Sequence, residues 1–200
     1  MCSICNEGIS KYMVSFQEDI NQCITVLEQG GLILYPTDTI WGIGCDAQNE
    51  SAVEKIFRLK QREDSKSLII LLSGRGELHN YIEHIPANIS DQLSNENPTT
   101  IIYPGGKNVA GKVLGKDGSI AIRLVKDSFC TSLIKQFGRA IISTSANISG
   151  MASPRIFNEI QDEIKNGVDY IVTYRREDEQ IKKPSTIFKI ETDGRLILIR

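Results

Sequence analysis

Apolar residues recur along this 200-residue chain at two spacings, one typical of amphipathic helices and one of short buried strands. From 17 to 29 they follow the helical period, and a glycine pair ends the pattern. Residues 32–35 form an apolar run that predicts a buried strand, which a proline stops. A second helix is expected at 51–59, with Ser51 as its N-cap and Glu54 completing a capping box.

The rest of the chain alternates apolar runs with polar loops. Further helices are expected at 127–137 and 154–165, strands at 67–72, 99–103, 120–123, 140–143, 170–173, 185–190 and 196–200, and a helical or loop region at about 75–95. Helices and strands alternate early, while strands cluster late. This order predicts a single-domain α/β fold with a twisted mixed parallel/antiparallel sheet flanked by helices. We assign 1–16 to an N-terminal extension and 17–200 to the domain.

The composition narrows the class of protein. With 40% hydrophobic and 24% charged residues, it is ordinary for a soluble globular protein. A net charge of −2 gives no overall nucleic-acid footprint, so RNA contact would need a local basic patch. No apolar run approaches the ~18 residues of a membrane span. The N-terminus also lacks the pattern of a signal peptide.

The five cysteines form an odd and scattered set, which is typical of reduced thiols and indicates a cytoplasmic protein. Cys2 and Cys5 make one CxxC pair, half of a zinc site, and neither a second CxxC nor a histidine pair follows. We therefore expect no protein-bound metal and interpret the pair as part of an inert terminal extension.

Two polar runs adjoin predicted strands. Lys60, Arg62 and Lys66 lie within seven residues before one strand, and the run from Ser143 to Asn147 puts three hydroxyls and an amide after another. Ligands of open α/β sheets bind outside strand ends, so these runs suit a small polyanion such as a nucleotide. The plain alternative for the cations is a solvated helix end. The sequence reveals no Ser/His/Asp triad and no obvious general base.

Five segments in this order resemble the YrdC/Sua5 family of L-threonylcarbamoyladenylate synthases. They are PTDTxxGxG from Pro36, KxR from Lys60, Ile-Ala-Ile-Arg123, the run from Ser143 to Asn147, and Pro-Ser-Thr-Ile from Pro184. The resemblance spans 18–200 and indicates the short form, because nothing remains for the extra C-terminal domain of longer Sua5 proteins. It implies a YrdC-like fold around a large basic cavity.

The resemblance also implies an activity. Family members condense L-threonine, bicarbonate or CO₂, and ATP into threonylcarbamoyl-AMP and pyrophosphate, for the t6A modification at position 37 of tRNA. Mg²⁺ is expected to arrive with ATP rather than in an all-protein cage. The product would pass to the tRNA threonylcarbamoyl-transferase complex. Any tRNA or double-stranded RNA binding is expected to be weak, and no membrane partner is expected.

Site residues follow from the resemblance, with Lys60 and Arg62 as the catalytic cations. Those expected to face ATP are Lys60, Arg62, Lys66, Ser145, Asn147, Ser153 and Arg200. Those expected to hold threonine are Thr39, Arg123, Ser143 and Thr186, with Arg123 the partner of its carboxylate. Neither Arg62 nor Arg123 is expected to matter for folding, since a site cation is not a core residue.

The chain departs from the family pattern at several positions. Glu63 and Ser67 stand where prolines are usual, Leu71 where longer members carry a histidine, and Asp127 where a histidine is usual. Two alternatives therefore stay open. One is a YrdC-fold paralogue that uses another carbamate substrate. The other is a double-stranded RNA or tRNA-binding protein without catalysis.

Overall fold

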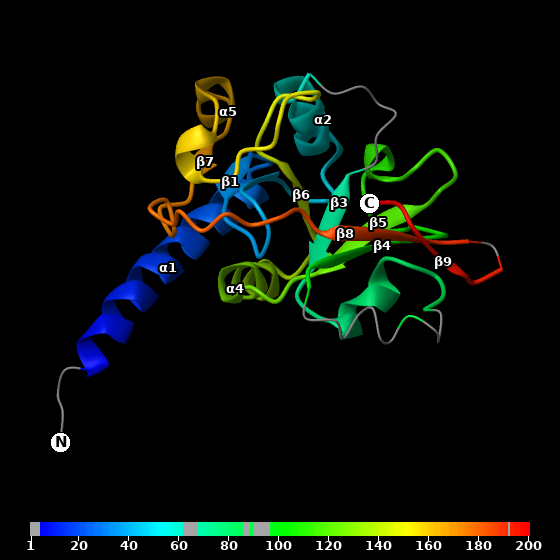
Figure 1. Cartoon of the computed structure of the whole chain (residues 1–200), viewed down its shortest axis with the longest axis horizontal. Helices are drawn as coiled ribbons and strands as arrows, with labels where there is room; N and C mark the ends of the chain where they lie inside the picture. Colours follow the sequence, from blue (N-terminus) through cyan, green and yellow to red (C-terminus); the bar gives the residue numbers. More distant parts are fainter. Residues whose placement is uncertain (1–4, 62–67, 86–88, 90–96, 192) are drawn as a thin grey trace.

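The computed structural model describes residues 5–61, 68–85, 89, 97–191 and 193–200, with the backbone alone for 5–16. Nine strands of these residues form one sheet in the order β7-β1-β2-β6-β3-β5-β4-β8-β9 (Figure 1). They are β1 Ile33–Tyr35, β2 Gly42–Gly44, β3 Ile69–Leu72, β4 Thr99–Tyr103, β5 Ile120–Leu124, β6 Ile141–Ser145, β7 Tyr170–Ile171, β8 Thr186–Ile190 and β9 Leu196–Leu198. The pairs β1–β7, β3–β5 and β4–β8 are parallel and the others antiparallel, which confirms the predicted mixed sheet.

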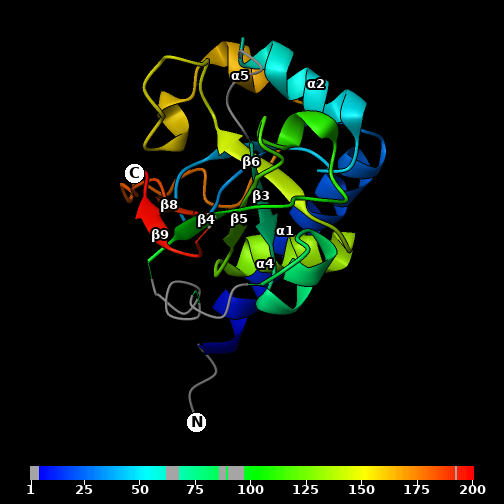
Figure 2. The same ribbon diagram turned by 90° about the vertical axis from the view of Figure 1, so that its right-hand side faces the viewer.

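Helices flank the sheet. They are α1 Cys5–Glu28, α2 Glu50–Leu59, α4 Ser128–Phe137 and α5 Asp162–Asn166, with short 3₁₀ turns η1 Arg75–Asn80, η3 Gly111–Val113 and η4 Phe157–Glu159. Figures 1 and 2 show α1 and α4 on one side of the central strands β3 and β6, and α2 and α5 on the other. α4 has the predicted helical period: Asp127 caps it, its buried face includes Phe129 and Leu133, and Gly138 ends it in the left-handed conformation.

The start of α2 differs from the prediction. Asn49, not Ser51, is the N-cap, and its Oδ1 accepts a hydrogen bond from the Ala52 amide at 3.0 Å. Glu54 does not close a capping box, because its carboxylate accepts from the Lys112 ammonium at 2.6 Å. The prediction failed because Asn49 and Ser51 are both suitable N-caps and stand two residues apart. In addition, Glu54 pairs with Lys112, which is distant in sequence.

Two other helix boundaries were wrong. α1 begins at Cys5, so the backbone of 5–16 continues the helix expected from 17. The helix expected at 154–165 is instead η4 followed by α5. Ile156 and Ile160 adopt extended backbone there, and the Phe157 ring packs against Trp41 with centroids 4.8 Å apart. Burial of these apolar groups overrides the local helical pattern.

β2 was not predicted as a strand, because three residues with two glycines carry almost no β signal. Its glycines are needed for close packing between β1 and β6. A Cβ on Gly44 would lie 2.7 Å from the Tyr35 ring and 2.8 Å from the Ile142 carbonyl oxygen. The Tyr35 hydroxyl donates to that same carbonyl at 3.1 Å, so the glycine lets the tyrosine span β2.

The buried apolar residues form one core that joins the helices to both halves of the sheet. Strands β3, β5 and β6 at its centre are nearly fully buried. In the described part of the chain, no helix has the length and apolar character needed to cross a membrane.

Candidate functional site

A cavity of about 530 Å³ lies over the central strands. β6, β3, β5, β4 and β8 contribute its lining, together with the turn before β2 and the last two residues of the chain. Ile69, Ala121 and Ser143 fall in one row across neighbouring strands, so their side chains share the face that lines it. Among the described lining residues, the charged ones are both arginines, Arg123 and Arg200. The cavity therefore suits an anionic ligand.

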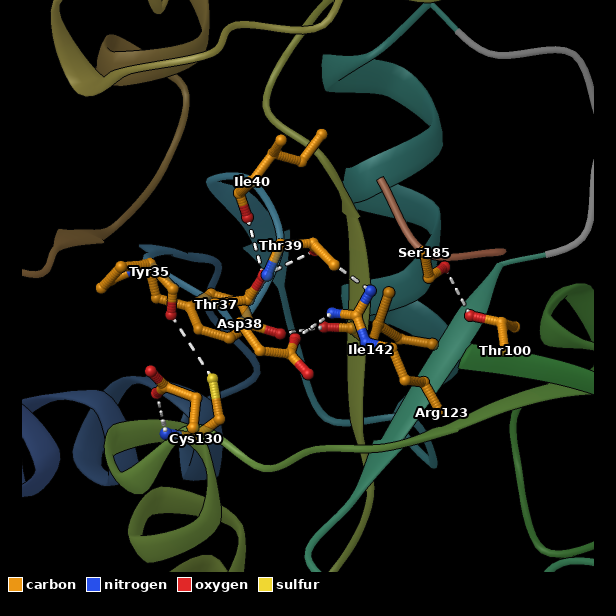
Figure 3. A network of polar contacts seen from close by, with 12 residues as sticks. Tyr35, Thr37, Asp38, Thr39, Ile40, Thr100, Arg123, Cys130, Ile142 and Ser185 are labelled. Atoms are coloured by element: carbon orange, nitrogen blue, oxygen red, sulfur yellow. Dashed lines mark hydrogen bonds and ion pairs between the residues drawn. The ribbon is translucent and has the colours of Figure 1, made fainter. Parts of the chain in front are cut away.

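Arg123 is the best-defined group of this site. It comes from β5 and is 4% exposed. Its Nη1 donates to the Thr39 hydroxyl at 3.1 Å, and its Nη2 lies 3.3 Å from an Asp38 carboxylate oxygen (Figure 3). Its Nε and Nη2 have no hydrogen-bond partner among the described residues. Buried guanidinium N–H groups with free donor capacity fit a carboxylate ligand.

The turn that carries Asp38 and Thr39 is held by its own hydroxyls. The Thr37 hydroxyl donates to the Ile40 carbonyl at 2.8 Å and accepts from the Thr39 amide at 3.0 Å. Arg175 donates to the Thr37 carbonyl at 3.3 Å from outside the turn. A turn fixed at both ends presents the Thr39 hydroxyl to Arg123 without rearrangement.

Hydroxyls continue along the cavity. Ser143 and Ser145, on β6, both line it. Ser185, just before β8, lines it too, and its hydroxyl is 2.7 Å from that of buried Thr100. Thr186, the residue predicted from the resemblance, is not among the lining residues, although its neighbour Ser185 is.

Arg200 and Ser153 complete the lining. Arg200 reaches the cavity from the C-terminus, and its Nη2 donates to the Ser185 carbonyl at 3.1 Å. Six of the predicted site residues thus meet around one cavity: Thr39, Arg123, Ser143, Ser145, Ser153 and Arg200. Arg62 and Lys66 lie outside the described residues, as do Glu63 and Ser67.

Lys60 and Asn147 lie behind the lining rather than on it. Lys60 is 1% exposed, and its ammonium donates to the main-chain carbonyls of Ser145 and Asn147. The Asn147 side-chain nitrogen donates to the carbonyls of Ile148 and Met151, at 2.9 and 2.8 Å. Both residues therefore contact the segment that carries Ser145.

The predicted site residues did not include Asp38, Trp41 or Ser185, although all three are neighbours of the cavity. Asp38 and Trp41 stand within the PTDTxxGxG segment and Ser185 within Pro-Ser-Thr-Ile, so the motifs contained them. No spacing rule, however, assigns the pairing of Asp38 with Arg123 across 85 residues. Leu71, where the resemblance implied a departure from the family pattern, is fully buried in β3.

Nucleophilic side chains near the site are held neutral. Burial raises the pKa of Tyr35 well above its usual value, and electrostatic interaction with nearby Cys130 raises that pKa further. Burial likewise raises the pKa of the Cys130 thiol, whose sulfur donates to the Pro36 carbonyl at 3.4 Å (Figure 3). In the described part of the chain, no three His, Cys, Asp or Glu residues gather as metal ligands.

Known proteins share both sequence and fold with this chain. The family model described as "Telomere recombination" (Sua5_yciO_yrdC) matches residues 25–200. A threonylcarbamoyl-AMP synthase of Pseudoalteromonas translucida is 33% identical over 163 residues, covering 80% of this chain and 87% of that protein. The crystal structure of E. coli YciO has a TM-score of 0.78 at 27% identity, covering 92% of this chain and 89% of that one. The structure of P. abyssi Sua5 complexed with L-threonine has a TM-score of 0.79 at 25% identity, covering 90% of this chain and 53% of that one.

Proposed function

The chain belongs to the Sua5–YciO–YrdC family, and from that premise we propose that it is a threonylcarbamoyl-AMP synthase. It condenses L-threonine, bicarbonate or CO₂, and ATP, and it releases pyrophosphate. The observation that carries the proposal is the cavity itself, whose described charged lining is two arginines among hydroxyls. The threonine carboxylate, bicarbonate and the ATP phosphates are all anionic and so suit such a cavity.

The threonine end of the site is proposed around Arg123. A free amino acid carboxylate accepts from the guanidinium donors that lack a partner, and the hydroxyls of Thr39 and Ser143 bind its polar groups. Thr186 remains a proposed threonine residue from the resemblance, and Ser185 beside it has the more direct access. A bicarbonate-derived carboxylate group would then form on the threonine amine.

The nucleotide end is proposed along the chain segment after β6. Ser145, Ser153 and Arg200 line the cavity there and donate to phosphate oxygens. Arg62 and Lys66, outside the described residues, are proposed to neutralise the departing pyrophosphate as catalytic and binding cations. Mg²⁺ is proposed to come with the triphosphate, and the donor set fits that role because the described part of the lining supplies hydroxyls rather than a carboxylate cluster.

The chemistry needs no protein nucleophile. The unprotonated threonine amine adds to CO₂ and loses one proton to water, which gives a carbamate. A carbamate oxygen then attacks the α-phosphorus while pyrophosphate leaves. Orientation of the two anions and stabilisation of the leaving group supply the catalysis. The product is proposed to pass to a tRNA threonylcarbamoyl-transferase complex in the cytoplasm.

The direct test measures pyrophosphate released from ATP by the purified chain. Release is expected only when L-threonine and bicarbonate are both present. Serine in place of threonine, and threonine in bicarbonate-free buffer, are the matched controls. Equal release with serine would overturn the threonine assignment, and equal release without any amino acid would reduce the activity to ATP hydrolysis.

A further inference from the structure

Lys60 ends α2 with its side chain turned inward. It is among the largest fully buried side chains, at 1% exposure, although it carries an ammonium. Lysine is almost never buried this completely unless its charge is satisfied by partners. Its described partners include the main-chain carbonyls of Ser145 and Asn147, 85 and 87 residues along the chain.

The same residue holds the segment with its own backbone as well. The Lys60 carbonyl accepts a hydrogen bond from the Ser149 amide at 2.8 Å. The Trp41 carbonyl accepts from the Ala146 amide at 3.1 Å, which fixes the segment from the other side. Lys60 thus contacts three positions in a stretch of five residues, 145–149. That stretch connects two cavity-lining hydroxyls, Ser145 and Ser153.

We propose that Lys60 is a positioning residue for ATP, acting through the 145–149 segment rather than by touching the nucleotide. The proposal rests on the proposed function. Lys60 does not line the cavity, so the two carbonyls that point at it turn their negative ends away from the bound phosphates. The Ser145 hydroxyl stays on the cavity side. Without the ammonium, two buried carbonyl oxygens lose their donor and the segment must rearrange to find others.

A compact ammonium suits this task better than a guanidinium. Its three N–H groups reach two carbonyl oxygens that flank a single residue, and it fits within a nearly closed space. A lysine that contacted the phosphates would instead be accessible to solvent and reagents in the ligand-free cavity. The two roles also predict different effects on ATP affinity when Ser145 is replaced in addition to Lys60.

The test is a double-mutant cycle on ATP affinity, measured by calorimetry without threonine. Ser145→Ala and Lys60→Met should each weaken ATP binding by about ten- to a hundredfold, the size of one charge-assisted hydrogen bond. The double variant should bind ATP no more weakly than Lys60→Met alone. Once Lys60 is replaced, the displaced Ser145 hydroxyl no longer contacts ATP, so its removal should have no further effect. Losses that multiply would mean that Lys60 contacts ATP independently and would overturn the proposal.

The control is Lys55→Met on the same helix. The Lys55 ammonium also donates to a main-chain carbonyl, that of Gly30 at 2.7 Å, which is not part of the 145–149 segment. The Lys55→Met variant should bind ATP with the same affinity as the unaltered chain. If Lys55→Met lost as much ATP affinity as Lys60→Met, the effect of Lys60→Met would be attributed to a general loss of stability on replacing a lysine of this helix. That result would overturn the positioning role.

A second measurement needs only the unaltered protein, in case Lys60→Met does not fold. Native reductive methylation followed by peptide mass spectrometry should leave Lys60 unmodified whether or not ATP is present. Modification without ATP and protection with it would make Lys60 a phosphate contact and would overturn the proposal. An unaltered chain that binds no ATP would refute the proposed function, whereas normal ATP binding with multiplicative losses refutes only the role of Lys60.

Discussion

Replacing Arg123 by alanine should damage both stability and threonine use, for separable reasons. The Arg123 and Asp38 side chains are 5% and 11% exposed and form an ion pair at 3.3 Å. Removing one partner of a buried pair leaves the other charge uncompensated, which costs about 3–5 kcal/mol. For a chain of this length, that corresponds to a fall in Tm of roughly 6–20 °C. We therefore no longer expect Arg123 to be dispensable for folding, because the structure buries it against a carboxylate.

The variant Asp38→Asn removes the charge that Arg123→Ala would strand. The double variant should therefore regain most of the stability lost by Arg123→Ala alone, since a neutral amide costs far less to bury than a carboxylate. Thermal unfolding of the two single variants and the double variant measures this directly. A double variant as unstable as Arg123→Ala would show that the stranded charge is not the cause.

Threonine use should not recover in the double variant. If Arg123 binds the threonine carboxylate, its loss removes about 1.5–3 kcal/mol, a rise of roughly ten- to a hundredfold in the threonine concentration needed for half-maximal pyrophosphate release. ATP affinity without threonine should change by less than about twofold, because the guanidinium faces Thr39 and Asp38. A folded double variant with an unchanged threonine requirement would refute the role of Arg123.

Three further changes test other parts of the structure. Arg62→Ala should weaken ATP binding measured without threonine and leave thermal unfolding nearly unchanged; unchanged ATP affinity would remove it from the site. Gly44→Ala should lower the free energy of unfolding, measured by urea titration, by about 1–3 kcal/mol or more, because its Cβ would overlap the Tyr35 ring. Gly74→Ala, where a Cβ would have no described atom within 4 Å, should be tolerated in the same titration. Iodoacetamide at pH 8 should modify three thiols only after unfolding, because burial raises their pKa and leaves little thiolate; peptide mass spectrometry would detect any native reaction of Cys23, Cys45 and Cys130.

The sequence predicted the fold wherever one local signal agreed with the tertiary environment. The helix expected at 127–137 is such a case, since its apolar period, its Asp127 cap and Gly138 all agree with burial against the sheet. The helix expected at 154–165 is interrupted, because Ile156 and Ile160 adopt extended backbone on either side of a 3₁₀ turn whose Phe157 packs on Trp41. β2 was missed because its stability comes from its two neighbours and not from its own residues.

The candidate site was predictable in its members but not in its arrangement. Thr39, Arg123 and Ser143 belong to motifs, yet their meeting depends on the strand order β2-β6-β3-β5, which no local pattern contains. For Lys60 the sequence predicts a cation beside a strand, but it does not reveal the direction of the side chain. Its burial against two main-chain carbonyls depends on the tertiary structure, because these carbonyls are 85 and 87 residues away in sequence.

The pairing of Arg123 with Asp38 also explains how a buried cation can be stable when no anionic ligand is bound. An isolated guanidinium at this depth would be costly, and a fully satisfied one would have no donor left for a ligand. Asp38 supplies the compensating charge, Thr39 accepts one N–H, and Nε keeps a donor without a partner among the described residues. At the proposed threonine site the arginine would thus be desolvated and oriented before the ligand binds, so little reorganisation would oppose binding. On that proposal Asp38 belongs to the threonine site, although it does not line the cavity.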